Sequence, residues 1–427
     1  MPDIPEIVPI AIETQWGLVY YIEQGRPPFE IVWSINEDEE VANLFGKAGL
    51  SPVLSNEDAT TIRYATHRLP EHISDSLYIA GRSIVYPSSE PYMYLNDTPY
   101  NAIQVSGWGF NRIVDSTRGS VGVATQTVLL PRDDQNYRDI RPNATTTTII
   151  QAGKRRQSAR DYLFPGAYTE SEIVKKVGSE LALWNILTSN GTNWDIPFHI
   201  PLPLMIGRYK GLVDPKGRPA YFYASSVPFS GMRDGIIFDQ SQENIDFLLN
   251  STPRIASALR VLHDYGLVHN QAGMGNINTS DTHNGGKPLL ADMATLTPLD
   301  LTPVRHPRTG KRIRNYGRAH DLLGVINGSL LSFNFSGTDP VSALQNSLSD
   351  VLFYYGAFNE NNAYALADTL SEILRDPANL DYYMAEFLDD AEDRGILDKQ
   401  PNIKQIQKHS VRELNYWENK MRQISRV

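Results

Sequence analysis

The most informative stretch of this chain is LHDYGLVHNQAGMGNI, residues 262–277. Just before and into it, Ile255, Leu259 and Leu262 recur at helical spacing, and Gly266 then ends the expected helix. A short apolar strand and a polar loop follow. The pattern therefore predicts a helix, a turn, a strand and then a loop that carries polar side chains.

A second short apolar strand follows in PLLADMA, residues 288–294, and it delivers Asp292 to another loop. A magnesium-bound polyphosphate prefers hard oxygen ligands, typically one amide and one carboxylate from adjacent loops. Asn276 and Asp292 supply that pair, so they are the expected ligands for Mg or Mn. The alternative is that Asn276 only forms a turn and that Asp292 only caps a following helix.

These residues resemble the catalytic loop of the protein-kinase superfamily, in which His-Arg-Asp is followed five residues later by Asn. His269 matches the histidine, which is expected to be a packed structural residue. Asn276 matches the metal-binding asparagine, and Asp292 matches the aspartate of Asp-Phe-Gly. Gln271 stands where the catalytic aspartate is expected. The resemblance also implies that a buried Asp321 braces this loop, and that ATP with Mg or Mn is the cofactor.

The resemblance extends to the preceding part of the chain, over residues of about 105 to 400. Lys154 stands where the ATP-anchoring and catalytic lysine is expected, although it could belong to a solvated basic cluster instead. Glu180 is the expected ion-pair partner of that lysine, and Glu172 is the alternative. Gly119 and Gly122 lie in a turn whose backbone amides could approach the phosphates of a bound nucleotide.

The order of expected elements predicts an α+β fold. The resemblance implies a kinase-like, two-lobed fold with an additional N-terminal module. The expected domains are an accessory module at 1–100, a small lobe at 101–230 and a helical large lobe at 231–427.

Within the accessory module, strands are expected at 10–22 and 29–35, and Asn36 is expected to cap a helix that ends near residue 48. The Pro- and Tyr-rich residues 86–100 predict a loop or linker. The basic residues 305–314 are expected to form an exposed loop rather than a binding patch.

Composition limits the classes of function. The 427 residues carry a formal net charge of −10 and disperse their cations, so a nucleic-acid partner is not expected. The chain has no cysteine, which excludes disulfides, thiolate metal sites and cysteine nucleophiles. No secretory signal or membrane-spanning run is recognised, so a cytoplasmic protein without membrane contact is expected, and delivery into another cell remains open.

Gln271 determines which reactions are expected. A glutamine can orient a nucleophile by hydrogen bonding, but it cannot take up a proton near neutral pH. Three hypotheses follow. The chain is an atypical ATP-dependent transferase that moves a phosphoryl or AMP group to a protein or small-molecule acceptor, or it is an inactive pseudokinase that binds nucleotide and a protein partner. In the third, it is an interaction protein with a vestigial site.

Overall fold

The computed structural model divides into two compact units, which are described separately. Unit 1 comprises residues 1–181, 201–229 and 418–427, and unit 2 comprises residues 182–200 and 230–417. The structure describes residues 9–14, 17–22, 29–47, 49–56, 58–59, 62, 78–80, 83–87, 90–95, 98–107, 113–114, 121–122, 168–189, 196–213, 219–228, 242–272, 276–278, 287–334, 340–375, 379–399 and 402–426. Helices and antiparallel strands occur together, so the fold is α+β, as predicted.

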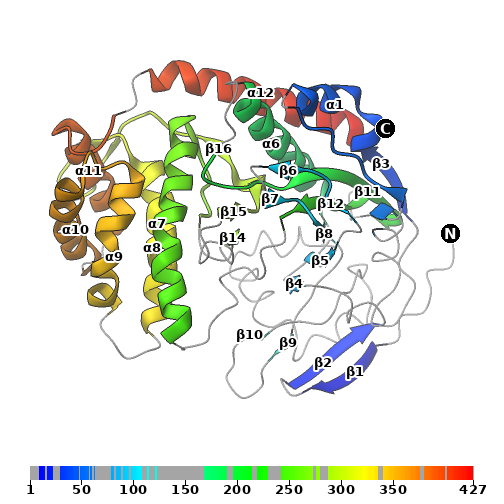
Figure 1. The fold of residues 1–427 in the computed structure, drawn as a ribbon, viewed down its shortest axis with the longest axis horizontal. Coiled ribbons are helices and arrows are strands. Elements are labelled where there is room, and N and C mark those ends of the chain that lie inside the picture. The colour runs from blue at the N-terminus through cyan, green and yellow to red at the C-terminus, as the bar shows by residue number, and fades with distance from the viewer. Residues whose placement is uncertain are drawn as a thin grey trace. The chain divides into compact units, whose positions relative to one another are not determined.

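A six-stranded antiparallel sheet organises unit 1 (Figure 1). All residues of one inner strand and all but the first of another are buried, so both faces of the sheet are covered there. In their order across the sheet, the strands are β3 (Phe29–Ser34), β11 (Leu202–Val213), β12 (Pro219–Val227), β8 (Ala102–Ser106), β5 (Ser83–Pro87) and β4 (Tyr78–Ala80).

This sheet crosses the domain boundary that was expected near residue 100. Strands β3, β4 and β5 come from the first hundred residues, yet they hydrogen-bond to β11 and β8 from the expected small lobe. Residue 100 therefore does not separate two compact units. The sequence shows where strands form, but pairing between distant strands leaves no local signal.

In the described part of unit 1, three further hairpins lie outside the large sheet, and all three are antiparallel. One of them corrects the loop expected at 86–100, because residues 94–95 and 98–99 form strands and Tyr92, Met93 and Tyr100 are buried. The paired strands are β1 (Pro9–Thr14) with β2 (Gly17–Ile22), β6 (Tyr94–Leu95) with β7 (Thr98–Pro99), and β9 (Ile113–Val114) with β10 (Val121–Gly122).

The first helix begins later than predicted. A 3₁₀ turn (Ile35–Glu37) precedes α1 (Glu39–Gly46), and Asp38 rather than Asn36 is the N-cap. The Asp38 carboxylate accepts hydrogen bonds from two backbone N–H groups of the first turn, at 3.1 and 3.2 Å. The Asn36 amide instead exchanges two hydrogen bonds with the backbone of Leu54, at 2.8 and 2.9 Å.

Helices dominate unit 2. Helix α7 contacts both α8 and α9, while α10 contacts α9 and α11 contacts α8 (Figure 1). These helices are α7 (Gln242–Asp264), α8 (Tyr316–Asn334), α9 (Pro340–Tyr355), α10 (Glu360–Arg375) and α11 (Leu380–Asp393). The division between the units falls within two other long helices, α6 (Glu170–Ser189) and α12 (Ile403–Ser425).

Short strand pairs follow α7 and carry the loops of interest. All are antiparallel two-stranded ladders, and a 3₁₀ turn (Met293–Thr295) separates two of them along the chain. The pairs are β13 (Leu267–Val268) with β16 (Thr297–Pro298), β14 (Ile277–Asn278) with β15 (Leu289–Leu290), and β17 (Val304–Arg305) with β18 (Arg312–Ile313).

Candidate functional site

The β14–β15 ladder brings Asn276 and Asp292 to the same end of two paired strands. Ile277 pairs with Leu290, and the N–H of Ala291 donates to the carbonyl oxygen of Asn276 at 2.9 Å. Asn276 therefore directly precedes β14 at the point where β15 ends and Asp292 begins to leave it. Both residues are half-buried, so each keeps part of its surface in contact with solvent.

The other edge of β15 is also held. His199 forms a parallel bridge to Leu289, and its N–H donates to Pro288 at 2.7 Å while its carbonyl accepts from Leu290 at 2.9 Å. The His199 side chain is buried, and burial together with nearby Lys287 lowers its pKa to about 4. A neutral, packed histidine therefore supports the strand that presents Asp292.

Asp292 adopts a left-handed backbone conformation, with φ 57° and ψ 46°. It precedes the 3₁₀ turn Met293–Thr295, yet its side chain forms no capping hydrogen bond with that turn. The helix-cap alternative for Asp292 is therefore not adopted. A non-glycine residue in this region costs on the order of 1 kcal/mol and is found disproportionately at ligand sites.

Gln271 and Asn276 contact each other directly. The Asn276 Nδ2 group donates to the backbone oxygen of Gln271 at 2.9 Å and lies 3.4 Å from its Oε1. Because a planar amide directs its oxygen away from its nitrogen, the Asn276 Oδ1 atom is left as a ligand oxygen. Gln271 is exposed and turns its Oε1 toward Asn276, so its Nε2 is the remaining donor of this amide.

Asp321, on α8, fixes the backbone beneath this loop. Its Oδ2 accepts from the N–H of His269 at 2.6 Å, and its Oδ1 accepts from the N–H of Asn270 at 2.7 Å. The expected bracing by a buried aspartate is confirmed, since Asp321 is 0% exposed. His269 is also fully buried and bonds through Nε2 to the Ala291 oxygen at 2.8 Å, which joins the loop to the Asp292 strand.

Asn270 adopts the second left-handed conformation at this site, with φ 62°. Its side-chain Nδ2 donates to the Thr295 oxygen at 2.9 Å and to the Thr297 hydroxyl at 2.6 Å. The residue before Gln271 is therefore fixed to the segment that follows Asp292. Together with the Asp321 bonds, these contacts fix the backbone of His269 and Asn270 to α8 and to the segment after Asp292.

Asp321 belongs to a buried polar chain that the sequence did not reveal. His263 Nε2 lies 3.1 Å from Asp321 Oδ2, and His263 Nδ1 lies 2.7 Å from the Tyr355 hydroxyl. Burial lowers the His263 pKa although Asp321 opposes that shift, and burial raises the pKa of Tyr355. A neutral His263 therefore donates to Asp321 and accepts from Tyr355.

The pKa of Asp321 lies below its usual value. Burial acts to raise it, but the hydrogen bonds from His263 and from the His269 backbone outweigh burial. Asp321 is therefore ionised in the folded chain, and its charge is shared among three N–H donors.

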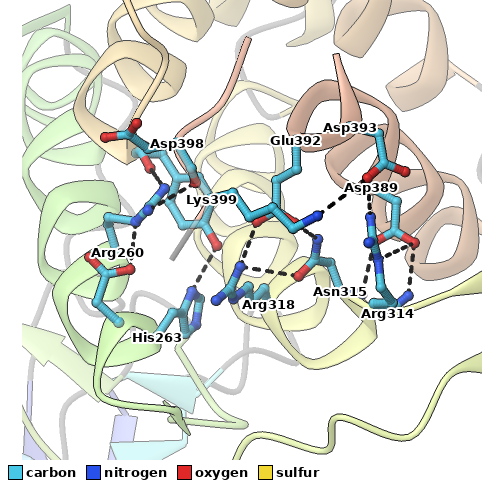
Figure 2. Close-up of polar contacts among 12 residues, drawn as sticks. Arg260, His263, Arg314, Asn315, Arg318, Asp389, Glu392, Asp393, Asp398 and Lys399 are labelled. Carbon is cyan, nitrogen blue, oxygen red and sulfur yellow. Dashed lines mark hydrogen bonds and ion pairs between the residues drawn. The ribbon is translucent and has the colours of Figure 1, made fainter. Parts of the chain in front are cut away.

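Arginines tie the surrounding helices together (Figure 2). Arg318 pairs with Glu392 of α11 at 2.7 Å, and both side chains are 8% exposed. Arg260 donates through Nη1 to the backbone oxygen of Tyr355 at 3.2 Å and pairs with Asp264 at 2.8 Å. Tyr355, whose hydroxyl bonds to His263, is thus itself held at the end of α9.

In unit 1, Glu180 lies fully buried on α6. It accepts a hydrogen bond from the Tyr223 hydroxyl, and Lys176 lies 3.5 Å from its other oxygen. Burial, followed by the charge of Glu180, raises the pKa of Tyr223 well above its usual value, so the phenol keeps its proton and donates. A surface position for Glu180 is excluded, because its carboxylate is surrounded by other side chains.

Glu172 has a different task. Its carboxylate accepts from the N–H of Thr169 at 2.8 Å, while the Thr169 hydroxyl accepts from the N–H of Glu172 at 3.3 Å. These reciprocal bonds form a capping box at the start of α6. The alternative ion-pair partner is therefore a helix cap.

Of three residues expected to bind nucleotide, Lys154, Gly119 and Gly122, the structure describes only Gly122. Lys154 and Gly119 lie outside the described residues, so the pairing of Lys154 with Glu180 stays a prediction. Gly122 ends β10 and pairs with Ile113 of β9. In the described part of the chain, no group of three or more His, Asp or Glu side chains gathers into a metal site.

Comparisons with known proteins add no family assignment. No family model matches the chain, and no curated protein is a significant match. Among the helices that the structure describes, none is both long enough and apolar enough to span a bilayer.

Proposed function

We propose that the chain is an atypical member of the protein-kinase-like superfamily, with a two-lobed nucleotide-binding fold. In this proposal it uses ATP and Mg or Mn to transfer a phosphoryl or AMP group to a protein or small-molecule acceptor. The observation that carries the proposal is the placement of Asn276 and Asp292 at one end of the β14–β15 ladder, next to a loop braced by Asp321.

The two ligand residues suit a metal that arrives with a nucleotide. Magnesium usually binds proteins through one or two side-chain oxygens and completes its shell with phosphates and water. The Asn276 Oδ1 and the Asp292 carboxylate are two such oxygens. A bound divalent cation would neutralise charge on the phosphates of ATP. The bonds from Asn276 to Gln271 and from His269 to Ala291 would keep the two ligands in register.

Gln271 argues for an unusual reaction. General-base catalysis contributes about 10²–10⁴-fold, and a glutamine cannot provide it. Its Nε2 donor instead suits negatively charged oxygen, since Oε1 faces Asn276. Transfer of a phosphoryl or AMP group to an already anionic acceptor, such as a carboxylate, releases no proton and so needs no proton acceptor at this position. Positioning and charge neutralisation would then supply most of the acceleration.

Isotope transfer from ATP tests the proposal. The purified chain is incubated with Mg or Mn and with ATP labelled at the α or the γ phosphate, and labelled products are separated by gel and thin-layer chromatography. We expect incorporation of one label only, the α label for AMP transfer and the γ label for phosphoryl transfer. Asp292→Asn should abolish it, while Asp368→Asn, at an exposed carboxylate of α10, should not. Labelling that survives Asp292→Asn contradicts the proposed site.

The second candidate function is an inactive pseudokinase, and Gln271 is the residue that favours it. In that case the same two oxygens bind a nucleotide without turning it over. Binding that depends on Asp292, combined with no incorporation of either label under any metal, would select this candidate.

A further inference from the structure

The hairpin formed by β17 and β18 presents two arginines side by side. Arg305 and Arg312 are direct cross-strand partners, and both are exposed. The other pair in the ladder, Val304 with Ile313, occupies the opposite face, where Ile313 is fully buried. Because side chains directly opposite each other in a ladder lie roughly 5 Å apart at Cβ, the two guanidinium groups share one small area of surface.

Neither arginine of this pair is neutralised within the described chain. Arg305 makes one hydrogen bond, from Nη1 to the backbone oxygen of Gly310 at 3.0 Å, and neither it nor Arg312 forms an ion pair with any described residue. The neighbouring cations behave differently. Lys311 pairs with Glu386 at 3.1 Å, and Arg314 pairs with Asp393 at 2.8 Å. Helix α11 thus neutralises its immediate neighbours and leaves positive charge at 305 and 312.

A buried histidine holds the hairpin rigid. His306 is 1% exposed and packs against the rings of Tyr382 and Tyr383, with centroids 5.7 and 4.7 Å away. Its Nδ1 accepts from the N–H groups of Arg308 and Thr309 at 3.1 and 3.2 Å, which shapes the turn. The two arginines are therefore presented on a fixed support, so little order must be gained when a ligand binds.

Like charges placed directly opposite each other destabilise a strand pair. A fixed, unneutralised pair of guanidinium groups has the arrangement of an anion-binding site, since each can donate two parallel hydrogen bonds to a phosphate or carboxylate. A phosphate monoester fits two arginines better than one carboxylate does, because it offers three acceptor oxygens and a charge of about −1.5 to −2.

We propose that Arg305 and Arg312 bind a phosphorylated side chain on a segment of a partner protein. The other two cations beside this pair, Lys311 and Arg314, already form ion pairs with Glu386, Asp389 and Asp393 of α11. The unneutralised charge is thus confined to two adjacent guanidinium groups, which match a single phosphate better than a long, uniformly charged polyanion such as a nucleic acid. This site does not depend on the proposed transferase activity.

Fluorescence anisotropy with the full chain tests the proposal. The probe is a labelled Gly- and Ser-rich peptide carrying one phosphoserine, compared with its unphosphorylated form, its glutamate form and a short oligothymidine. We expect the phosphopeptide to bind about tenfold or more tightly than any of the others, with an affinity that falls as salt rises. Arg305→Gln with Arg312→Gln should remove that preference.

The matched control is Arg375→Gln with Arg394→Gln, which removes the same charge from two exposed arginines that already pair with carboxylates on their own helices. It should change phosphopeptide affinity by less than about twofold. The Arg305/Arg312 double variant should keep or slightly raise the melting temperature, because it relieves repulsion. Equal losses in both double variants, equal binding of the unphosphorylated or glutamate peptide, or tighter binding of oligothymidine would overturn the proposal.

Discussion

Asp321 and Asp292 both belong to unit 2, but their carboxylates lie in opposite environments. Asp321 is 0% exposed and accepts hydrogen bonds from two backbone N–H groups and from His263. Asp292 is half-buried, has a left-handed backbone and makes no capping bond to the turn that it precedes. The Asp321 carboxylate accepts hydrogen bonds inside the fold, whereas Asp292 lies at a strand end on a left-handed backbone.

The difference separates stability from ligand binding. A series of hydrogen bonds runs from Tyr355 through His263 and Asp321 to the backbone of His269, and each of these bonds is buried. A substitution in this series of hydrogen bonds should lower the stability of unit 2, whatever its effect on ligand binding. A substitution at Asp292 should leave the fold intact and remove one of the two proposed metal ligands. The predictions below test this separation.

Asp321→Ala should have the largest effect. It leaves the N–H groups of His269 and Asn270 and the Nε2–H of His263 buried without an acceptor. Loss of an acceptor for several buried donors typically costs about 3–5 kcal/mol. Urea unfolding followed by circular dichroism measures the change, and Asp368→Ala on the surface of α10 should stay within about 0.5 kcal/mol. A loss below about 1 kcal/mol for Asp321→Ala would show that the brace is dispensable.

Acid should weaken the fold through His199. Its folded pKa of about 4 lies below the unfolded value of 6.5, so the unfolded chain takes up the proton first. The contribution to stability is complete above pH 6.5 and is lost as the pH falls toward 4, with about 2 kcal/mol lost between pH 7 and 5. His263 acts in the same direction. Urea titrations at both pH values should show a smaller decline for His199→Gln; identical declines would contradict a buried neutral His199.

Tyr355→Phe should have a smaller effect. It removes the hydroxyl that donates to His263 Nδ1 and keeps the ring, which packs on His263 with centroids 5.8 Å apart. One lost buried hydrogen bond typically costs about 1 kcal/mol. Tyr354→Phe is the matched control, because that neighbouring ring is 52% exposed. Equal stability of the two variants would indicate that Tyr355 does not support the brace.

Local signals predicted much of unit 2. Helical spacing, Gly266 and two short apolar runs correctly placed α7, β13 and β15. The Asp321 contacts confirm the bracing that the resemblance to the kinase catalytic loop implied. The expectation of a kinase-like family stays a prediction.

Other features depend on contacts that a sequence does not display. The hydrogen bond between Tyr355 and His263 joins residues far apart in the sequence. Taken alone, each residue looks like any other helical residue and gives no sign of this contact. Pairing of β3 with β11 placed early residues in the main sheet of unit 1. Asp38 replaced Asn36 as a helix cap because Asn36 found a more distant partner in Leu54. The pairing of Arg305 with Arg312 also appeared only with the strand register.

The most direct test is the thermal unfolding of the wild-type chain and of Asp292→Asn, each with and without ATP and magnesium. Asparagine keeps the size of the side chain and tolerates a left-handed backbone. Without ligand, the free energies of unfolding of the two proteins should therefore agree within about 0.5 kcal/mol. Ligand at about one hundred times its dissociation constant should stabilise the wild type by about 2.7 kcal/mol and leave the variant unchanged. Equal shifts in both proteins, or none in the wild type, would contradict a metal–nucleotide site at Asn276 and Asp292.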